Sequence, residues 1–125
     1  MYDSELDNQI RIERVSSAYW RVTFNILPLN IFGPQNMAPL QAVVAALETD
    51  KDVRVVVFDS AIDGFFITHY DFLASPEHTL SLPLGPTGLQ QLPDALVRLS
   101  RAPVVSIAKI RGRATGVGSE LALAC

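Results

Sequence analysis

The stretch that decides the fold is Pro103-Val-Val-Ser-Ile-Ala-Lys-Ile-Arg-Gly-Arg-Ala-Thr-Gly-Val-Gly-Ser-Glu120. Its apolar residues 103–110 predict a buried strand, its glycines predict a tight turn, and Glu120 falls in the first turn of the helix expected after them. Backbone N–H groups at the start of a helix have no partner within it and lie at the positive end of its dipole. The stretch therefore predicts a place where an anion or a polarised carbonyl oxygen can bind.

The preceding sequence alternates between strand and helix patterns. Residues 10–15 and 18–26 alternate apolar and polar side chains, which predicts an antiparallel hairpin. A helix is predicted over 37–49, with Asn36 as its N-cap and apolar residues at helical spacing. The near-continuous apolar run at 53–58 is typical of a parallel strand covered on both faces.

The second half of the chain continues the alternation after a long irregular segment. Residues 61–86 are rich in glycine and proline, with a short helical turn expected at 71–74. A helix is predicted over 89–100, with Pro93 in its first turn, and the strand 103–110 follows. The order β-β-α-β-loop-α-β-α indicates an α/β protein in which helices cover a sheet.

Composition limits the class of protein and its partners. The chain has 125 residues, of which 49% are hydrophobic, enough for one packed domain. A net charge of -3 argues against a nucleic-acid partner. No apolar run reaches the roughly eighteen residues of a membrane span, and the acidic residues 1–7 do not resemble a targeting signal, so we expect a cytoplasmic protein. The only cysteine is Cys125, and no cluster has metal-ligand spacing, so neither a disulfide nor a metal is expected.

Several segments together resemble one known family. Phe65-Phe-Ile-Thr-His-Tyr-Asp71 and the glycine stretch that runs on into Glu120-Leu-Ala-Leu-Ala-Cys125 are similar to two segments of the crotonase, or enoyl-CoA hydratase/isomerase, superfamily, in the same order. Asp52-Val-Arg-Val-Val-Val57 and Asn30 also match its N-terminal half. The resemblance implies a crotonase-like ββα-spiral core over 1–125, an incomplete domain truncated after the start of the helix that follows the second oxyanion-hole turn.

The resemblance also implies acyl-CoA chemistry and roles for particular residues. The backbone N–H groups of Tyr70 and Val117 would form an oxyanion hole for the thioester carbonyl, and Glu120 would position water and transfer a proton. Substrate contacts are implied for three residues of the same turns: Thr68, His69 and Gly116. Coenzyme A would enter as part of the substrate, with no other cofactor, and the family implies a homo-oligomer, trimeric or hexameric.

The chain departs from the family pattern at both turns. Thr68-His69 stands where the family has Ala-Gly, and Gly116-Val117-Gly118 stands where it has three glycines, so both turns are expected to add bulk near the acyl group. The segment that would bring the second hydratase glutamate lies beyond Cys125. Hydration of a 2-enoyl-CoA is the leading function, and isomerisation or thioester hydrolysis stay open. An inactive fragment that serves as a binding or assembly piece is the main alternative.

Further alternatives concern individual features. Gly112-x-x-x-Gly116-x-Gly118 is similar in spacing to the NAD(P)-binding turn of short-chain dehydrogenases, but such a turn follows the first strand and needs an acidic residue about twenty positions later. Glu120 is alternatively a first-turn carboxylate that stabilises the helix dipole. Asp71 is interpreted as a helix cap. The alternating basic residues of the glycine stretch either meet CoA phosphates or are solvated: Lys109, Arg111 and Arg113.

Overall fold

The computed structural model describes residues 9–125, and the hairpin predicted near its start is confirmed. β1 (Ile10–Arg14) pairs antiparallel with β2 (Tyr19–Phe24). β3 (Val55–Ser60) then pairs parallel with β2, and β4 (Val105–Ala108) pairs parallel with β3. The result is a four-stranded sheet in the order β1-β2-β3-β4. Each parallel addition requires a crossover, which the helices supply.

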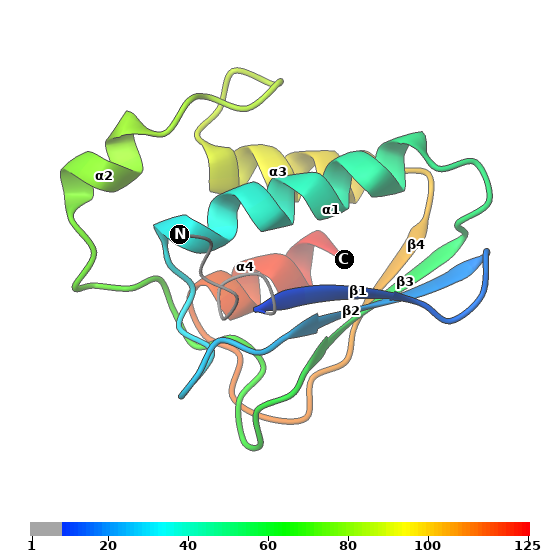
Figure 1. Cartoon of the computed structure of the whole chain (residues 1–125), viewed down its shortest axis with the longest axis horizontal. Coiled ribbons are helices and arrows are strands. Elements are labelled where there is room, and N and C mark those ends of the chain that lie inside the picture. Colours follow the sequence, from blue (N-terminus) through cyan, green and yellow to red (C-terminus); the bar gives the residue numbers. More distant parts are fainter. Residues whose placement is uncertain (1–8) are drawn as a thin grey trace, which may run out of the picture.

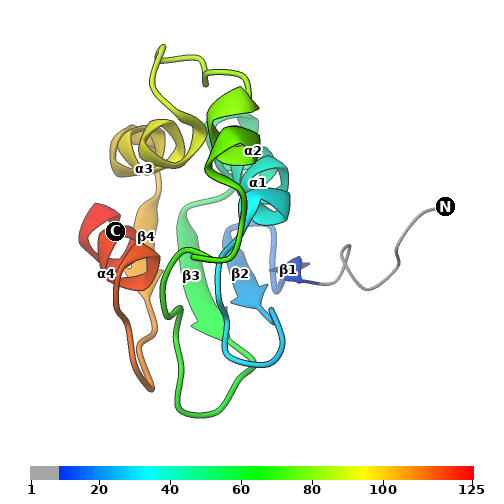
Figure 2. The same cartoon turned by 90° about the vertical axis from the view of Figure 1, so that its left-hand side faces the viewer.

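The helices lie together on one side of this sheet (Figure 1). The short 3-10 helix η2 (Pro34–Asn36) leads into α1 (Met37–Thr49), which connects β2 to β3. α2 (Pro76–Ser81) and α3 (Gln91–Arg101) lie between β3 and β4, and α4 (Val117–Ala124) follows β4. α3 packs against both α1 and α4, while α2 stands apart from the sheet beside the start of α1 (Figure 2). The predicted α/β order is confirmed.

The predicted capping role of Asn36 is wrong. Its side chain makes no capping hydrogen bond to α1. Instead its Oδ1 accepts a hydrogen bond from the Gly33 N–H at 2.9 Å, and its Nδ2 donates to Gln9 Oε1 at 2.7 Å. Asn36 therefore closes the 3-10 turn before α1 and ties it to the start of β1.

The segment 61–86 holds a helix that the sequence pattern missed. The expected helical turn at 71–74 is a simple turn, in which Asp71 Oδ1 accepts from the Leu73 N–H at 2.9 Å. Asp71 therefore caps no helix. The helix lies later, as α2, and begins after Ser75, whose Oγ accepts from the His78 N–H at 3.4 Å. α2 buries none of its residues, so it shows no apolar stripe in the sequence.

The prediction that the strand before the glycine turn is buried is also wrong. Val105 is 60% exposed and Ile107 is 44% exposed. β4 is the last strand of the sheet, and α4 contacts it on one side only. The half-buried Ser106 and Ala108 lie on that side, while the larger apolar Val105 and Ile107 lie on the exposed side. Hydrophobicity alone predicts the opposite arrangement.

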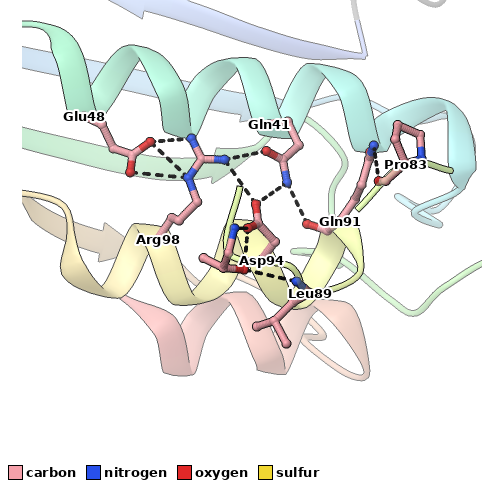
Figure 3. Close-up of polar contacts among 8 residues, drawn as sticks. Gln41, Glu48, Pro83, Leu89, Gln91, Asp94 and Arg98 are labelled. Carbon is pink, nitrogen blue, oxygen red and sulfur yellow. Dashed lines mark hydrogen bonds and ion pairs between the residues drawn. The ribbon is translucent and has the colours of Figure 1, made fainter. Parts of the chain in front are cut away.

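A buried polar network fastens α3 to α1 (Figure 3). Asp94 is 0% exposed, and its Oδ1 accepts hydrogen bonds from Thr87 N at 2.8 Å and Thr87 Oγ1 at 2.6 Å. Its Oδ2 accepts from Gln41 Nε2 at 2.7 Å and from Arg98 Nη1 at 3.1 Å. Arg98 also pairs with Glu48 on α1. Burial opposes ionisation of Asp94, but these hydrogen bonds outweigh it and lower its pKa to about 2.

Candidate active site

The turn after β3 and the glycine turn after β4 lie against each other. Phe66 N donates to the Arg113 carbonyl at 2.8 Å, and Thr115 N donates to the Ile67 carbonyl at 3.2 Å. Thr115 Oγ1 donates to the Thr68 carbonyl at 2.6 Å. Because β3 and β4 are parallel neighbours, their carboxyl ends open at the same edge of the sheet, where α/β proteins bind ligands.

Two glycines permit this close approach. A Cβ atom on Gly118 would lie 2.0 Å from the Ile67 carbonyl oxygen, so any side chain at this position would clash with that oxygen. Gly116 has a φ of 51°, and a Cβ there would lie 3.2 Å from His69 Cα. Any larger residue at 118 would push the two turns apart, and one at 116 would strain the backbone. The glycine pattern thus sets the separation between the turns.

The predicted backbone donors, Tyr70 and Val117, both have N–H groups without an acceptor among residues 9–125. Tyr70 forms a parallel bridge with Phe32, in which Phe32 N donates to the His69 carbonyl at 2.9 Å and Asp71 N donates to the Phe32 carbonyl at 2.8 Å. In such a bridge the amide of the central residue points away from its partner. Val117 is the first residue of α4, so its amide has no partner within the helix.

Glu120 lies in the first turn of α4, as predicted. Its own N–H donates to the Gly116 carbonyl at 3.0 Å. The side chain is exposed, and it makes no hydrogen bond or ion pair with any residue from 9 to 125. The Glu120 carboxylate therefore lies about one helical turn from the Val117 amide and has no hydrogen-bond or ion-pair partner among the described residues.

The bulky substitutions in the two turns are directed largely into the protein. Val117 is 4% exposed and belongs to the hydrophobic core. Thr68 is buried, and its Oγ1 lies 3.2 Å from the carbonyl oxygens of both Leu29 and Asn30. His69 is half-buried, and its Nδ1 donates to the Tyr70 carbonyl at 2.7 Å. The side chains of Val117 and Thr68 thus hold the turns in place, which the sequence pattern did not indicate.

Asn30 supports the first turn, and this role follows only from the structure. Its backbone φ is 55°, a conformation that asparagine tolerates better than most residues. Its buried Oδ1 accepts from Ile26 N at 2.7 Å, and its Nδ2 donates to Ser60 Oγ at 2.8 Å and to the Phe66 carbonyl at 2.7 Å. The Asn30 carbonyl accepts from Thr68 N at 3.1 Å. One side chain therefore joins the loop after β2, the end of β3 and the candidate donor turn.

An apolar hollow adjoins the donor turn. It has a volume of about 220 Å³ and lies between α1, α2 and α3, with Tyr70 on its wall. Its apolar lining comes from Met37, Leu80, Leu82, Leu92 and Pro93. A hollow of this chemistry suits an aliphatic group better than a charged one.

The basic residues of the glycine stretch divide into two kinds. Arg111 Nη2 donates to Asp59 Oδ1 at 2.9 Å and to the Ser60 carbonyl at 2.8 Å. Lys109 Nζ lies 3.8 Å from Asp59 Oδ2, while Arg113 is exposed. Burial of Asp59 opposes its ionisation, but hydrogen bonds from Arg111 and the Ser60 N–H, together with the charges of Arg111 and Lys109, outweigh this and lower the pKa of Asp59. Two of the three cations are thus paired with a carboxylate of this chain.

Two other kinds of feature are absent from the described part of the chain. Residues 9–125 contain no group of three or more His, Cys, Asp and Glu side chains placed to hold a metal ion. Within the same residues, no helix combines the length and the apolar character that crossing a membrane requires.

The sheet, its helices and the paired turns define a crotonase-type fold. A Streptomyces avermitilis protein assigned as an enoyl-CoA hydratase superposes with a TM-score of 0.81 at 38% identity, covering 94% of this chain and 42% of that one. Enoyl-CoA hydratase from Bacillus anthracis, at 19% identity and a TM-score of 0.76, shares the fold over 94% of this chain and 45% of its own. The family model for enoyl-CoA hydratase/isomerase matches residues 15–125, and the chain belongs to this family. The interpretation of the glycine turn as an NAD(P)-binding turn of a short-chain dehydrogenase is therefore wrong.

Curated relatives of the chain carry the word hydratase in their names. The mouse mitochondrial enoyl-CoA hydratase domain-containing protein 2 is 36% identical over 96 residues, which is 77% of this chain and 32% of the relative. The (E)-benzylidenesuccinyl-CoA hydratase of Thauera aromatica is 34% identical over 97 residues, which is 78% of this chain and 37% of the relative. The human mitochondrial methylglutaconyl-CoA hydratase is 36% identical over 86 residues, 69% of this chain and 25% of the relative. The chain thus spans about a third of the length of such relatives.

Proposed function

We propose that this chain provides the oxyanion-stabilising part of an acyl-CoA hydratase. In this proposal the N–H groups of Tyr70 and Val117 bind the thioester carbonyl oxygen, and Glu120 handles the proton of the attacking water. The observation that carries the proposal is the pair of unpartnered amides on two turns that contact each other. The bridge to Phe32 and the start of α4 fix the backbone at these two amides, so they are oriented before substrate arrives.

The chemistry requires charge to develop on one oxygen. Water adds through its oxygen to C3 of a 2-enoyl-CoA, and the π electrons of the C2–C3 double bond shift so that the thioester carbonyl becomes an enolate. Glu120 accepts the proton that the water loses. The enolate then collapses as C2 takes up a proton, which Glu120 returns, so the overall reaction adds one water and leaves no net charge.

The two amides act where the negative charge appears. Preorganised N–H donors aimed at a developing oxyanion are commonly the largest catalytic effect, and the loss of one donor costs about 3 kcal/mol of transition-state stabilisation. The Tyr70 amide is fixed by the bridge to Phe32, and the Val117 amide is fixed by the start of α4. Neither needs to reorganise during the reaction.

Hydration is the favoured member of a set of related reactions. Isomerisation and thioester hydrolysis would use the same pair of amides, because each passes through a negatively charged thioester oxygen. The names of the curated relatives favour hydration, since two are called hydratases and one a hydratase domain-containing protein, at 34% to 36% identity. The apolar hollow beside Tyr70 suits the acyl part of such a substrate.

The test removes one N–H and little else. Val117 is the first helical residue of α4, a position where proline is tolerated because its amide has no intrahelical partner. Val117→Pro therefore deletes the donor, and Val117→Ala is the matched control that keeps the donor and loses similar packing. We expect the hydration rate of a 2-enoyl-CoA to fall about 100- to 1000-fold in Val117→Pro relative to Val117→Ala.

Other results would redirect the proposal. A folded Val117→Pro variant that hydrates substrate as fast as the alanine control contradicts the donor role. A wild-type protein that binds acyl-CoA without hydrating it supports the alternative of an inactive binding piece. Circular dichroism on both variants confirms that the comparison is between folded proteins.

A further inference from the structure

The side chain of Tyr70 joins the candidate donor turn to α2. Its hydroxyl Oη lies 2.6 Å from Thr79 Oγ1, so one hydroxyl donates to the other. Tyr70 and Thr79 are both half-buried, whereas α2 as a whole buries no residue. The residue that presents its backbone N–H toward the site therefore also holds the helix beside it.

This hydroxyl pair stands between two apolar hollows. The first is the hollow of about 220 Å³ between α1, α2 and α3. The second, of about 380 Å³, adjoins the turn after Tyr70 and the start of α2 and is lined in part by Phe72, Ala74 and Pro76. Three residues line both hollows and so form the wall between them: Tyr70, Thr79 and Leu80.

We propose that the Tyr70–Thr79 hydroxyl pair is a partition that sets the length of the acyl chain this site accepts. The inference rests on the proposed function, because it assigns the first hollow to the acyl group of the thioester bound at Tyr70. While the pair is intact, an acyl chain fills the first hollow and stops at the wall. When the pair is broken, the two hollows join and a longer chain stays out of water.

The physical basis is the weak attachment of α2. A methylene group that moves from water into an apolar hollow gains roughly fourfold in affinity, the factor that corresponds to about 0.8 kcal/mol. A chain that meets the wall gains nothing from its next methylene unless it displaces α2. Because α2 has no buried side chain of its own, the bond from Thr79 to Tyr70 is a contact that opposes this displacement.

The experiment compares chain-length profiles in matched variants. Tyr70→Phe and Thr79→Val remove the two ends of the same bond and preserve side-chain shape, while Thr79→Ser keeps the hydroxyl. Dissociation constants for saturated acyl-CoAs of increasing length are measured by isothermal titration calorimetry. For wild type and Thr79→Ser we expect affinity to rise roughly fourfold per methylene and then to level off at one length.

In Tyr70→Phe and Thr79→Val the levelling is expected about two methylenes later. An acyl chain two methylenes beyond the wild-type limit should then bind about fifteenfold more tightly to these variants than to wild type. Hydrogen exchange of residues 76–81 should accelerate in the same variants, while exchange in β2 and β3 stays unchanged. Either variant alone decides the question if the other does not fold.

The outcomes separate this inference from the proposed function. If wild type shows a length limit and both variants share it, or if exchange in α2 does not change, the partition is overturned while the oxyanion role stands. If wild type binds acyl-CoA of no length, the proposed function fails and the partition fails with it.

Discussion

Asp94→Asn is the substitution whose effect follows most directly from the structure. The carboxylate is 0% exposed and receives four hydrogen bonds, from Thr87, Gln41 and Arg98. An asparagine in the same place keeps one oxygen as acceptor and turns an NH₂ group toward donors. Arg98 also loses one of its two carboxylate partners but keeps Glu48.

The expected loss of stability follows from the lowered pKa of Asp94 and from the cost of breaking a buried ion pair. The pKa of Asp94 is about 2 in the folded protein against an ordinary value of 3.8. At roughly 1.4 kcal/mol per pKa unit, the ionised group contributes about 2 kcal/mol to stability at neutral pH. Removing one partner of a buried ion pair costs about 3 to 5 kcal/mol, and the remaining pair with Glu48 places this case at the low end. We therefore expect Asp94→Asn to lose about 2 to 3 kcal/mol at pH 7.

The sign of the pH dependence follows from the lowered pKa. A group whose folded pKa lies below its unfolded value stabilises the fold above the unfolded pKa, and this stabilisation is lost as pH falls through the folded pKa. For Asp94 the loss runs from about pH 4 down to about pH 2. The difference between wild type and Asp94→Asn should therefore shrink by about 1 kcal/mol between pH 5 and pH 3.

Urea unfolding at several pH values checks both numbers. The exposed Asp52→Asn is the control for a general change in charge, and we expect it to shift stability by less than about 0.5 kcal/mol. A loss below about 1 kcal/mol for Asp94→Asn at pH 7 would refute the network argument. A loss that is the same at pH 3 as at pH 7 would refute the assignment of the lowered pKa.

Two further predictions concern the site itself. Asn30→Ala leaves the buried Ile26 N–H and Phe66 carbonyl without a side-chain hydrogen bond and removes one donor to Ser60 Oγ. We therefore expect a loss of about 3 kcal/mol in urea unfolding, against little change for the neighbouring Asn25→Ala. A loss under about 1 kcal/mol would show that water replaces the side chain. Glu120→Gln should lower hydration turnover about 100- to 10,000-fold with unchanged affinity for a saturated acyl-CoA, and unchanged turnover would leave Glu120 as a helix-dipole carboxylate only.

Local patterns in the sequence predicted most of the fold. The hairpin, α1, α3 and the parallel strands all follow from apolar periodicity that a short segment carries by itself. The position of Glu120 at the start of α4 follows from the glycine turn before it. The boundaries of β3 and β4 moved by about two residues at their ends, where hydrogen bonds to a neighbouring strand, and not the residue types, decide the limits.

The site was predicted only in outline. The family resemblance pointed to the turns that hold Tyr70 and Val117, and the structure places these turns in contact. Their catalytic roles stay predictions. The support from Asn30 and the hydroxyl pair of Tyr70 with Thr79 had no signal in the sequence pattern, because each joins groups whose spacing has no periodicity.

The sequence by itself determined the order of the strands and of every helix except α2, the glycines at 116 and 118, and a carboxylate one turn into α4. Local backbone preference and the spacing of apolar residues are sufficient for these. The tertiary structure alone decided that Gly118 would face the Ile67 carbonyl, that β4 would expose its valine and isoleucine, and that Asp94 would ionise in a buried network. Each of these features depends on which distant segments pack together. The free energy of such a contact depends on both segments, so neither segment's sequence predicts it alone.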